Sequence, residues 1–173
     1  MKPTLHNKNF YEIYDLIETE SFDLILTDPP YGILTDVQKW DTEPDILLLE
    51  EICANLLKPT GQLVVFCDIH LLSKFLTIIN NSLQFRFYHI WKKPGGMPTS
   101  TSRPINDSEF ILIFRRKGEL EKGLAWNPKA MGESGEPYYK RNTSPDVSTR
   151  KQKKSKQNRN ITGERYPKTI LEA

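Results

Sequence analysis

Apolar positions follow two different periods along the first two thirds of the chain, and each period predicts one kind of element. Short apolar runs between turn residues predict buried strands, and apolar residues three and four positions apart predict helices. The expected strands are residues 22–28, 63–67, 85–91 and 110–115, and the expected helices are residues 46–57 and 71–80. Strands and helices in this order predict an α/β fold with a mostly parallel sheet and right-handed crossovers.

The start of the chain carries weaker signals. Residues 3–7 are consistent with a short strand, and residues 10–18 have apolar side chains at helical spacing. Asn9 precedes this helix, where its side chain can accept a hydrogen bond from a free backbone amide, so we expect Asn9 to be an N-cap. Asp68 and His70 follow a strand and resemble an acid/base pair, but we expect Asp68 to start a helix and His70 to lie on the surface.

The segment Asp28-Pro29-Pro30-Tyr31-Gly32 comes at the end of the first predicted strand. Proline fixes its own φ, lacks an N–H group and biases the preceding residue toward extended backbone, so this turn should be stiff. In open α/β sheets, ligands bind beyond the carboxyl ends of strands. The motif therefore predicts a binding site. The alternative is an ordinary turn, since Asp, Pro and Gly all favour turns, but the buried-strand pattern before the motif weakens that alternative.

The residue types in the motif suit chemistry on an aromatic amino group. Such a nitrogen is a poor nucleophile because its lone pair is delocalised, so a catalyst must accept its hydrogens as an electrophilic methyl group approaches. We expect Asp28 and the Pro29 carbonyl to be the acceptors, Pro30 to stiffen the turn and Tyr31 to stack on the base. A base in duplex DNA must first leave the stack. Asp28, Pro29, Pro30 and Tyr31 are therefore the candidate catalytic residues.

Charge divides the chain into two regions. Residues 1–114 carry 9 Lys or Arg against 15 Asp or Glu, a net charge of −6, whereas residues 115–173 carry 15 against 7, a net charge of +8. A positive region beside an acidic body predicts a surface that faces phosphates. We expect a catalytic α/β region at 1–116 and a basic, partly flexible region at 117–173 that contacts DNA. The candidate DNA-binding residues are Lys140, Arg141, Arg150, Lys151, Lys153 and Lys154.

A solvated tail is an equally good interpretation of the basic run at residues 150–156, because the run has no apolar face. Other classes of protein are disfavoured. The sequence has neither an apolar run long enough to cross a membrane nor a signal-like N-terminus, so we expect a cytoplasmic protein. Cys53 and Cys67 lack a Cys-x-x-Cys spacing and are expected to be reduced core thiols. No metal site is expected.

The segment Phe22 to Gly32, followed by Lys39-Trp40-Asp41, resembles the amino-methyltransferases that use S-adenosylmethionine, specifically the DNA adenine-N6 group of bacteria and phages. Similar segments continue along nearly the whole chain, at residues 57–66, 91–93, 109–114, 126–128 and 165–171. The resemblance implies a Rossmann-like methyltransferase sheet in which the last two strands form an antiparallel edge. It also implies S-adenosylmethionine as the cofactor, double-stranded DNA as the partner and target recognition in the variable region at 117–173.

The resemblance adds roles for three residues. It implies that Asp28 also meets the cofactor. Asn9 stands near the place where many relatives have the acid of a Gly-Asp pair, and it is the second cofactor candidate. Trp40 either packs near the flipped base, as a substrate contact together with Tyr31, or pins the loop to the core, and the two alternatives are equal.

Two parts of the family pattern do not occur in this sequence. These are a His-Pro-Thr-Gln-Lys-Pro segment and a Phe-x-Gly-x-Gly turn, which cradles the cofactor in the family. The histidines of the chain are His6, His70 and His89, and no Gly-x-Gly occurs. We therefore expect a sheet that is incomplete at the C-terminus, and a second polypeptide or a missing C-terminal segment that completes the cofactor site.

The function expected from these residues is methyl transfer from S-adenosylmethionine to the N6 amino group of adenine in DNA. Cytosine-N4 methylation is the related alternative, and its motif more often begins with Ser, so Asp28 favours adenine. The alternative from another class is a catalytically incompetent fragment, or half of a split enzyme, that only binds DNA.

Overall fold

The computed structural model describes residues 3–34, 36–94, 106–118, 138–139, 159–160 and 169–172. The chain divides into two compact units, one made of residues 1–125 with 169–173 and the other of residues 126–168. The first unit contains the α/β fold. The described part of the second unit is an antiparallel pair of short strands, β5 (Tyr138–Tyr139) and β6 (Arg159–Asn160).

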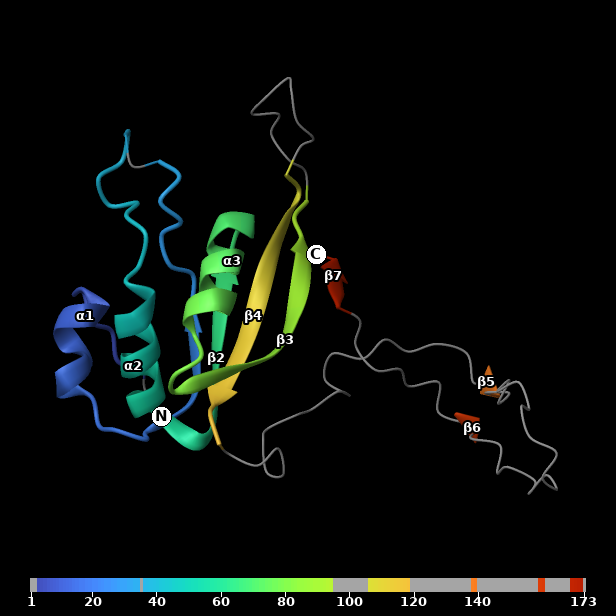
Figure 1. Cartoon of the computed structure of the whole chain (residues 1–173), viewed down its shortest axis with the longest axis horizontal. Coiled ribbons are helices and arrows are strands. Elements are labelled where there is room, and N and C mark those ends of the chain that lie inside the picture. The colour runs from blue at the N-terminus through green and yellow to red at the C-terminus, as the bar shows by residue number, and fades with distance from the viewer. Residues whose placement is uncertain are drawn as a thin grey trace. The chain divides into compact units, whose positions relative to one another are not determined.

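Five strands of the first unit form one mixed sheet in the order β1-β2-β4-β3-β7 (Figure 1). They are β1 (Phe22–Thr27), β2 (Leu57–Cys67), β3 (Leu83–Lys92), β4 (Ser108–Arg116) and β7 (Ile170–Glu172). The pairs β1–β2 and β3–β7 are parallel, whereas β4 is antiparallel to both of its neighbours. Four strands therefore run in one direction, and the expected α/β class with a mostly parallel sheet is confirmed.

The antiparallel pair of β3 and β4 forms as expected, but it is not an edge of this sheet. β4 lies between β2 and β3, and β7 borders β3 on its other side, with Ile90 opposite Ile170. The reason is a pairing between distant parts of the chain, which local hydrophobic periodicity cannot show. The sheet also begins its second strand earlier than expected, because β2 starts at Leu57 directly after a helix and pairs there with Phe22.

Three α-helices accompany the sheet in the described residues: α1 (Phe10–Ile13), α2 (Ile46–Leu56) and α3 (Ile69–Ile78). A short 3-10 turn (Tyr14–Leu16) follows α1. The expected helix at 10–18 is thus shorter than predicted, because Ile17 has extended backbone at φ −104° and ψ 134°. The strand expected at 3–7 is wrong, since these residues are exposed and no strand of the sheet pairs with them.

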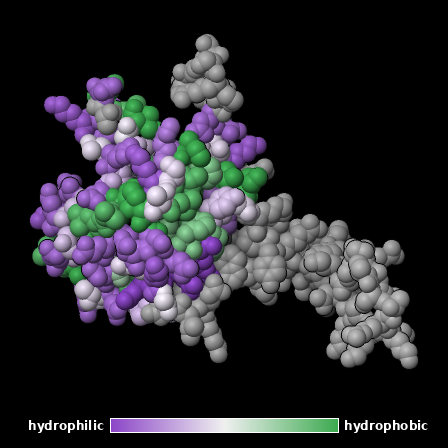
Figure 2. Space-filling model, in the orientation of Figure 1, coloured by the Kyte–Doolittle hydropathy of each residue, from purple (hydrophilic) through white to green (hydrophobic). Residues whose placement is uncertain are grey.

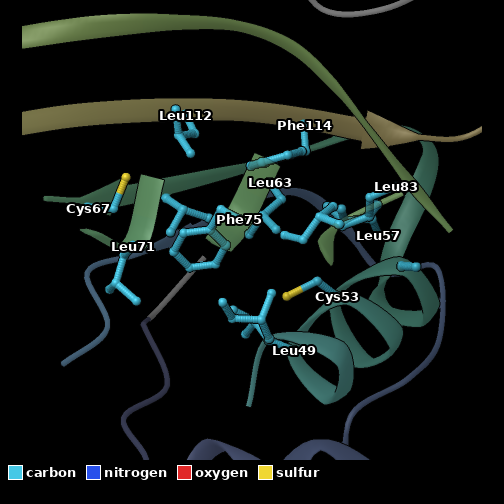
Figure 3. Close-up of a cluster of buried hydrophobic side chains, with 14 residues drawn as sticks. Leu49, Cys53, Leu57, Leu63, Cys67, Leu71, Phe75, Leu83, Leu112 and Phe114 are labelled. Atoms are coloured by element: carbon cyan, nitrogen blue, oxygen red, sulfur yellow. The ribbon is translucent and has the colours of Figure 1, made fainter. Parts of the chain in front are cut away.

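The hydrophobic core lies between α2, α3 and one face of the sheet (Figure 3). Leu63 on β2, Phe114 on β4 and Phe75 on α3 are completely buried there. Cys53 and Cys67 are free, buried members of the same cluster. Burial raises the pKa of each thiol to about 12, so both stay protonated near neutral pH. The expectation of core thiols outside a disulfide is confirmed.

The strand that leads into the motif is only partly covered by other parts of the described chain. β1 stands at one end of the strand order, and among the described residues only β2 pairs with it. Leu24 and Leu26 on β1 are 53% and 63% exposed.

On the face seen in Figure 2, apolar residues gather near the middle of the described body, with hydrophilic residues around them. None of the helices in the described part of the chain is long and apolar enough to span a membrane.

Candidate active site

The loop between β1 and α2 places the candidate catalytic residues at the carboxyl end of a sheet strand. Figure 1 shows this loop, in blue to cyan, extending past the end of α2. Asp28 is exposed, and Pro29 and Pro30 are half-buried. Because neither proline has an N–H group, the backbone at these two positions offers no donor to the Asp28 carboxylate. The acid is therefore left available for a ligand.

A cleft of about 690 Å³ opens beside the motif, which is within the usual range for small-molecule sites. Residues 25–30 form one wall, residues 9–11 contribute from the N-terminal segment, and Trp40 and residues 42–45 contribute from the loop. The structure thus brings together Asn9, Asp28 and Trp40, which the sequence marked separately as site candidates.

Asn9 is both a helix cap and a cleft residue. Its Oδ1 accepts a hydrogen bond from the Tyr11 backbone N–H at 3.1 Å, so the expected N-cap is confirmed. Capping uses the side-chain oxygen and leaves the amide NH2 group as a donor. Phe10 also lines the cleft and offers an aromatic surface for a flat ligand.

Tyr31 occupies a different place from the one expected. Its half-buried ring packs against the hydrophobic core and is not among the residues that line the cleft. Its hydroxyl donates a hydrogen bond to Asp28 Oδ1 at 2.8 Å. In this arrangement Tyr31 orients the acid and does not present its ring to a ligand.

The tyrosine hydroxyl is held in its protonated form. Burial, together with the hydrogen bond to Asp28 and the negative charge of that residue, raises the pKa of Tyr31 well above its usual range. The neutral phenol can therefore serve as a hydrogen-bond donor across the whole physiological pH range. One oxygen of the Asp28 carboxylate is engaged by this donor, and the other is the candidate acceptor for a substrate hydrogen.

Asp41 is a residue of the site that the sequence interpretation missed. Its side chain is only 4% exposed, although it lies in a loop. Oδ1 accepts hydrogen bonds from the N–H groups of Tyr31 at 3.0 Å and Gly32 at 3.1 Å, and Oδ2 accepts one from Leu34 at 2.6 Å. These bonds, led by the one from Leu34, lower the pKa of Asp41. The carboxylate therefore fixes the backbone that follows the two prolines.

Gly32 marks a second close contact within the same loop. Its φ of +71° lies in the left-handed region, which disfavours residues with a Cβ. A Cβ at this position would stand 2.5 Å from Cγ of Glu43. Glu43 forms an ion pair with Lys74 on α3. The loop thus folds back on itself and is joined to the helix layer.

Trp40 lies at the cleft but does not anchor the loop. The side chain is 67% exposed, and its Nε1 donates a hydrogen bond to the Gln38 side chain. The alternative in which Trp40 pins the loop to the core is therefore wrong. Its role as a contact for a flat substrate stays a prediction.

Other expectations are answered in part. Asp68 begins α3 as expected, since its Oδ1 accepts a hydrogen bond from the Leu71 N–H at 2.9 Å, and His70 is exposed.

The candidate DNA-binding residues Lys140, Arg141, Arg150, Lys151, Lys153 and Lys154 lie outside the described residues. Within the described ranges, no group of three or more His, Cys, Asp or Glu side chains is arranged to hold a metal ion.

Comparison with solved structures finds matches of low sequence identity. A structure of M1.HpyAVI in complex with SAM is 24% identical, with a TM-score of 0.46, and the match covers 62% of this chain and 51% of that one. A putative DNA modification methylase from Thermus thermophilus, complexed with S-adenosyl-L-methionine, is 20% identical, with a TM-score of 0.47 and coverage of 70% and 54%. PvuII DNA methyltransferase, which is cytosine-N4-specific, is 14% identical, with a TM-score of 0.46 and coverage of 62% and 47%.

The matched region spans about half the length of these solved proteins. A search among curated proteins gave no significant match. The family result is clear. The sequence model of the DNA methylases named N6_N4_Mtase matches residues 22–171, which contain the motif, its loop and all of the five-stranded sheet except the last residue of β7. The chain belongs to this family of adenine-N6 and cytosine-N4 DNA methylases.

Proposed function

We propose that this chain carries the substrate-orienting half of a DNA methyltransferase reaction, in which a methyl group moves from S-adenosylmethionine to the N6 amino group of adenine. The chain is a member of the N6_N4_Mtase family, and one observation of its structure supports the proposal. The cleft at the carboxyl end of β1 joins an exposed acid, two prolines and an aromatic wall in one site.

The residues of the cleft fit the proposed cofactor. Phe10 offers a ring for an adenine base, and the NH2 group of Asn9 offers a donor. Asp28 supplies a negative charge next to a molecule that carries a sulfonium and an ammonium group. When bound, S-adenosylmethionine would supply an electrophilic methyl group and leave as S-adenosylhomocysteine, and the amino nitrogen would lose one proton, for which Asp28 is the proposed acceptor. Asn9 and Asp28 are therefore the proposed cofactor contacts.

The motif would prepare the amino group for attack. The Asp28 oxygen that Tyr31 does not occupy accepts one amino hydrogen, and the Pro29 carbonyl accepts the other. Both acceptors disfavour the delocalised, planar form of the nitrogen and so raise its nucleophilicity. Pro30 keeps the turn stiff, so the acceptors are aimed before substrate arrives.

The role of Tyr31 separates into two proposals that a pair of variants can test. Its hydroxyl orients Asp28, and its ring would stack on the base only after leaving its place against the core. If stacking dominates, Tyr31→Phe retains transfer and Tyr31→Ala loses it. If orientation of the acid dominates, both variants lose transfer to a similar extent. Trp40, exposed at the rim of the cleft, is the other proposed base contact.

The basic C-terminal residues are the proposed phosphate contacts on double-stranded DNA. Lys140, Arg141, Arg150, Lys151, Lys153 and Lys154 contribute six positive charges near one another in sequence. Replacing Lys151, Lys153 and Lys154 together by Gln should weaken binding evenly across DNA sequences and reduce its salt dependence. A triple variant with wild-type affinity at all salt concentrations would contradict these contacts.

The experiment for the proposed function combines cofactor binding with product analysis. S-adenosylmethionine is titrated calorimetrically into the folded chain, and the chain is then incubated with cofactor and duplex DNA, whose nucleosides are analysed by mass spectrometry. N6-methyladenine supports the proposal, and N4-methylcytosine would replace the adenine assignment by cytosine. A folded chain that retards DNA in a gel but binds no cofactor and makes neither product would contradict catalysis by this chain. It would favour a fragment that only binds DNA.

A further inference from the structure

We infer that Asp41 is a positioning residue for the reaction proposed above, on which this inference rests. Its carboxylate gathers three backbone donors of the segment that follows Pro30 and thereby sets the direction of the acceptors at Asp28 and Pro29. The residue does not line the cleft and is not expected to touch substrate or cofactor.

The contacts are concentrated on one short segment. Pro29 and Pro30 have no N–H group, so the first amide after Asp28 that can be tied down is that of Tyr31. Asp41 binds this amide at 3.0 Å, the amide of Gly32 at 3.1 Å and that of Leu34 at 2.6 Å. The chain between Tyr31 and Asp41 is thereby closed into a ring at the point where the prolines end.

A full negative charge suits this arrangement better than a neutral side chain. Two carboxylate oxygens accept three N–H groups, and hydrogen bonds to a charged acceptor are stronger than neutral ones. The side chain is buried, so these bonds compete little with water. An asparagine at position 41 would offer one oxygen and an NH2 group, and that NH2 group would face at least one of the backbone donors.

The consequence for the site follows from rigid geometry. The Tyr31 N–H belongs to the same peptide unit as the Pro30 carbonyl, so fixing one fixes the plane of the other. Because the φ angles of Pro30 and Pro29 are restricted, fixing this peptide plane also limits the orientation of Asp28. Misplacing a catalytic group by about 1 Å can cost about 100-fold in rate, so a loosened turn should be visible in kcat.

Three variants of the full chain test the inference. They are Asp41→Asn, Asp41→Ala and the control Asp36→Asn, which removes an exposed charge from the same loop at a position that does not line the cleft. Circular dichroism establishes folding, calorimetry measures S-adenosylmethionine affinity, and steady-state kinetics on duplex DNA separates kcat from KM. Asp41→Asn should lower kcat by about 10- to 100-fold while the cofactor dissociation constant changes by less than about 3-fold. Asp36→Asn should keep kcat within about 2-fold of the wild type, because an exposed side chain outside the cleft contributes little to the fold or the site.

A stability effect alone would overturn the inference. If folded Asp41→Asn is less resistant to urea but keeps the wild-type kcat, Asp41 is a structural residue of the loop and has no part in positioning. The same holds if kcat and cofactor affinity fall together for Asp41→Asn, because the whole cleft has then been lost.

A second measurement uses the unmodified chain and needs no activity. Amide exchange followed by NMR should be slower at Tyr31, Gly32 and Leu34 than at the exposed neighbour Lys39. Fast exchange at all three overturns the inference even if Asp41→Asn does not fold. Slow exchange in a chain that binds no cofactor and methylates nothing would leave the anchored turn in place and reject the proposed function instead.

Discussion

Two aspartates lie at equivalent positions in this sheet but differ in burial and in hydrogen bonding. β1 and β2 are parallel neighbours, with Thr27 opposite Val65, and each strand is followed by an acid at the same edge of the sheet. Asp68, after β2, is 7% exposed and caps α3 through the Leu71 N–H. Asp28, after β1, is exposed and is held by a tyrosine hydroxyl.

The difference between them comes from the residues that follow. After Asp68, the N–H groups of a starting helix point back to the carboxylate, which satisfies them as an N-cap. After Asp28, two prolines remove the nearest donors, and the next amides are bound by Asp41. An acid at the end of a strand is thus structural when nearby backbone N–H groups donate to its carboxylate. It is available for chemistry when the residues that follow offer no such donors.

The largest expected effect separates the two acids by activity. Asp28→Ala should reduce methyl transfer to DNA by at least about 100-fold, because it removes the acceptor that orients the amino group. Asp68→Ala should leave kcat within about 2-fold of the wild type in the fraction that is folded, because a cap contributes to stability and not to the reaction. Mass spectrometry of the nucleosides from methylated DNA measures both. Equal losses of activity in the two folded variants would refute the distinction.

The next effect tests the shape of the loop after β1. Gly32→Ala must place a Cβ at φ +71° and displace Cγ of Glu43, whereas Gly118→Ala has a φ of +83° with no atom within 4 Å of the new Cβ. The left-handed conformation alone costs about 1–2 kcal/mol for a residue with a Cβ. Urea denaturation should show Gly32→Ala as less stable than Gly118→Ala by a further ~1 kcal/mol. Equal losses of stability in the two variants would mean that the Glu43 side chain moves away from the new Cβ at no measurable cost.

A smaller effect tests the cap after β2. Asp68→Ala should lower the free energy of unfolding by about 1 kcal/mol, because it leaves the Leu71 N–H without its acceptor. Asp68→Asn should cost less than about 0.5 kcal/mol, since asparagine caps helices as well as aspartate does. Chemical denaturation with matched slopes measures both changes. Loss of stability in the asparagine variant as large as in the alanine variant would show that the charge, and not the cap, matters.

The smallest effect is a pH dependence in the loop after β1. The pKa of Asp41 is lowered in the folded chain, with the hydrogen bond from Leu34 as its main cause. Its contribution to stability is therefore complete above the unfolded value of about 3.9 and is lost as the pH falls through the lower folded value. The urea midpoint of the wild type should fall more steeply below about pH 4 than that of Asp41→Asn. Parallel curves would mean that the Asp41 bonds do not depend on its charge.

Local pattern was sufficient for the elements that carry the motif. The apolar run at β1 and the helical spacing at α2 predicted these elements to within about one residue, and the N-cap positions of Asn9 and Asp68 followed from residue type alone. Resemblance to a family then marked Asn9 as a cofactor candidate. The position of Asn9 beside Asp28 is a tertiary contact, which no periodicity encodes.

The remaining features depend on contacts that only folding creates. Asp41 meets Tyr31 because a loop turns back over ten positions. The sequence placed Asp41 in a segment that resembles the family, but no local pattern gave it a role. The Lys-Pro-Thr-Gly segment after α2 is typical of a turn, yet it lies within β2 because the sheet extends over it. The residue type of Tyr31 is typical of a stacking residue. In the structure its ring packs against the core and its hydroxyl donates a hydrogen bond to Asp28.

The position of β7 has a consequence for the order in which the sheet is completed. Its three residues pair with the end of β3, so that Ile170 meets Ile90, whereas β3 and β4 are joined by partners as near in sequence as Lys92 and Ser108. Closing a longer loop costs more chain entropy, at about 0.6 kcal/mol for each doubling of its length. On a ribosome, β1 to β4 are already outside or folding before residues 170–172 are made. We therefore expect β7 to join the sheet after β1 to β4 during synthesis and to leave it before them during unfolding.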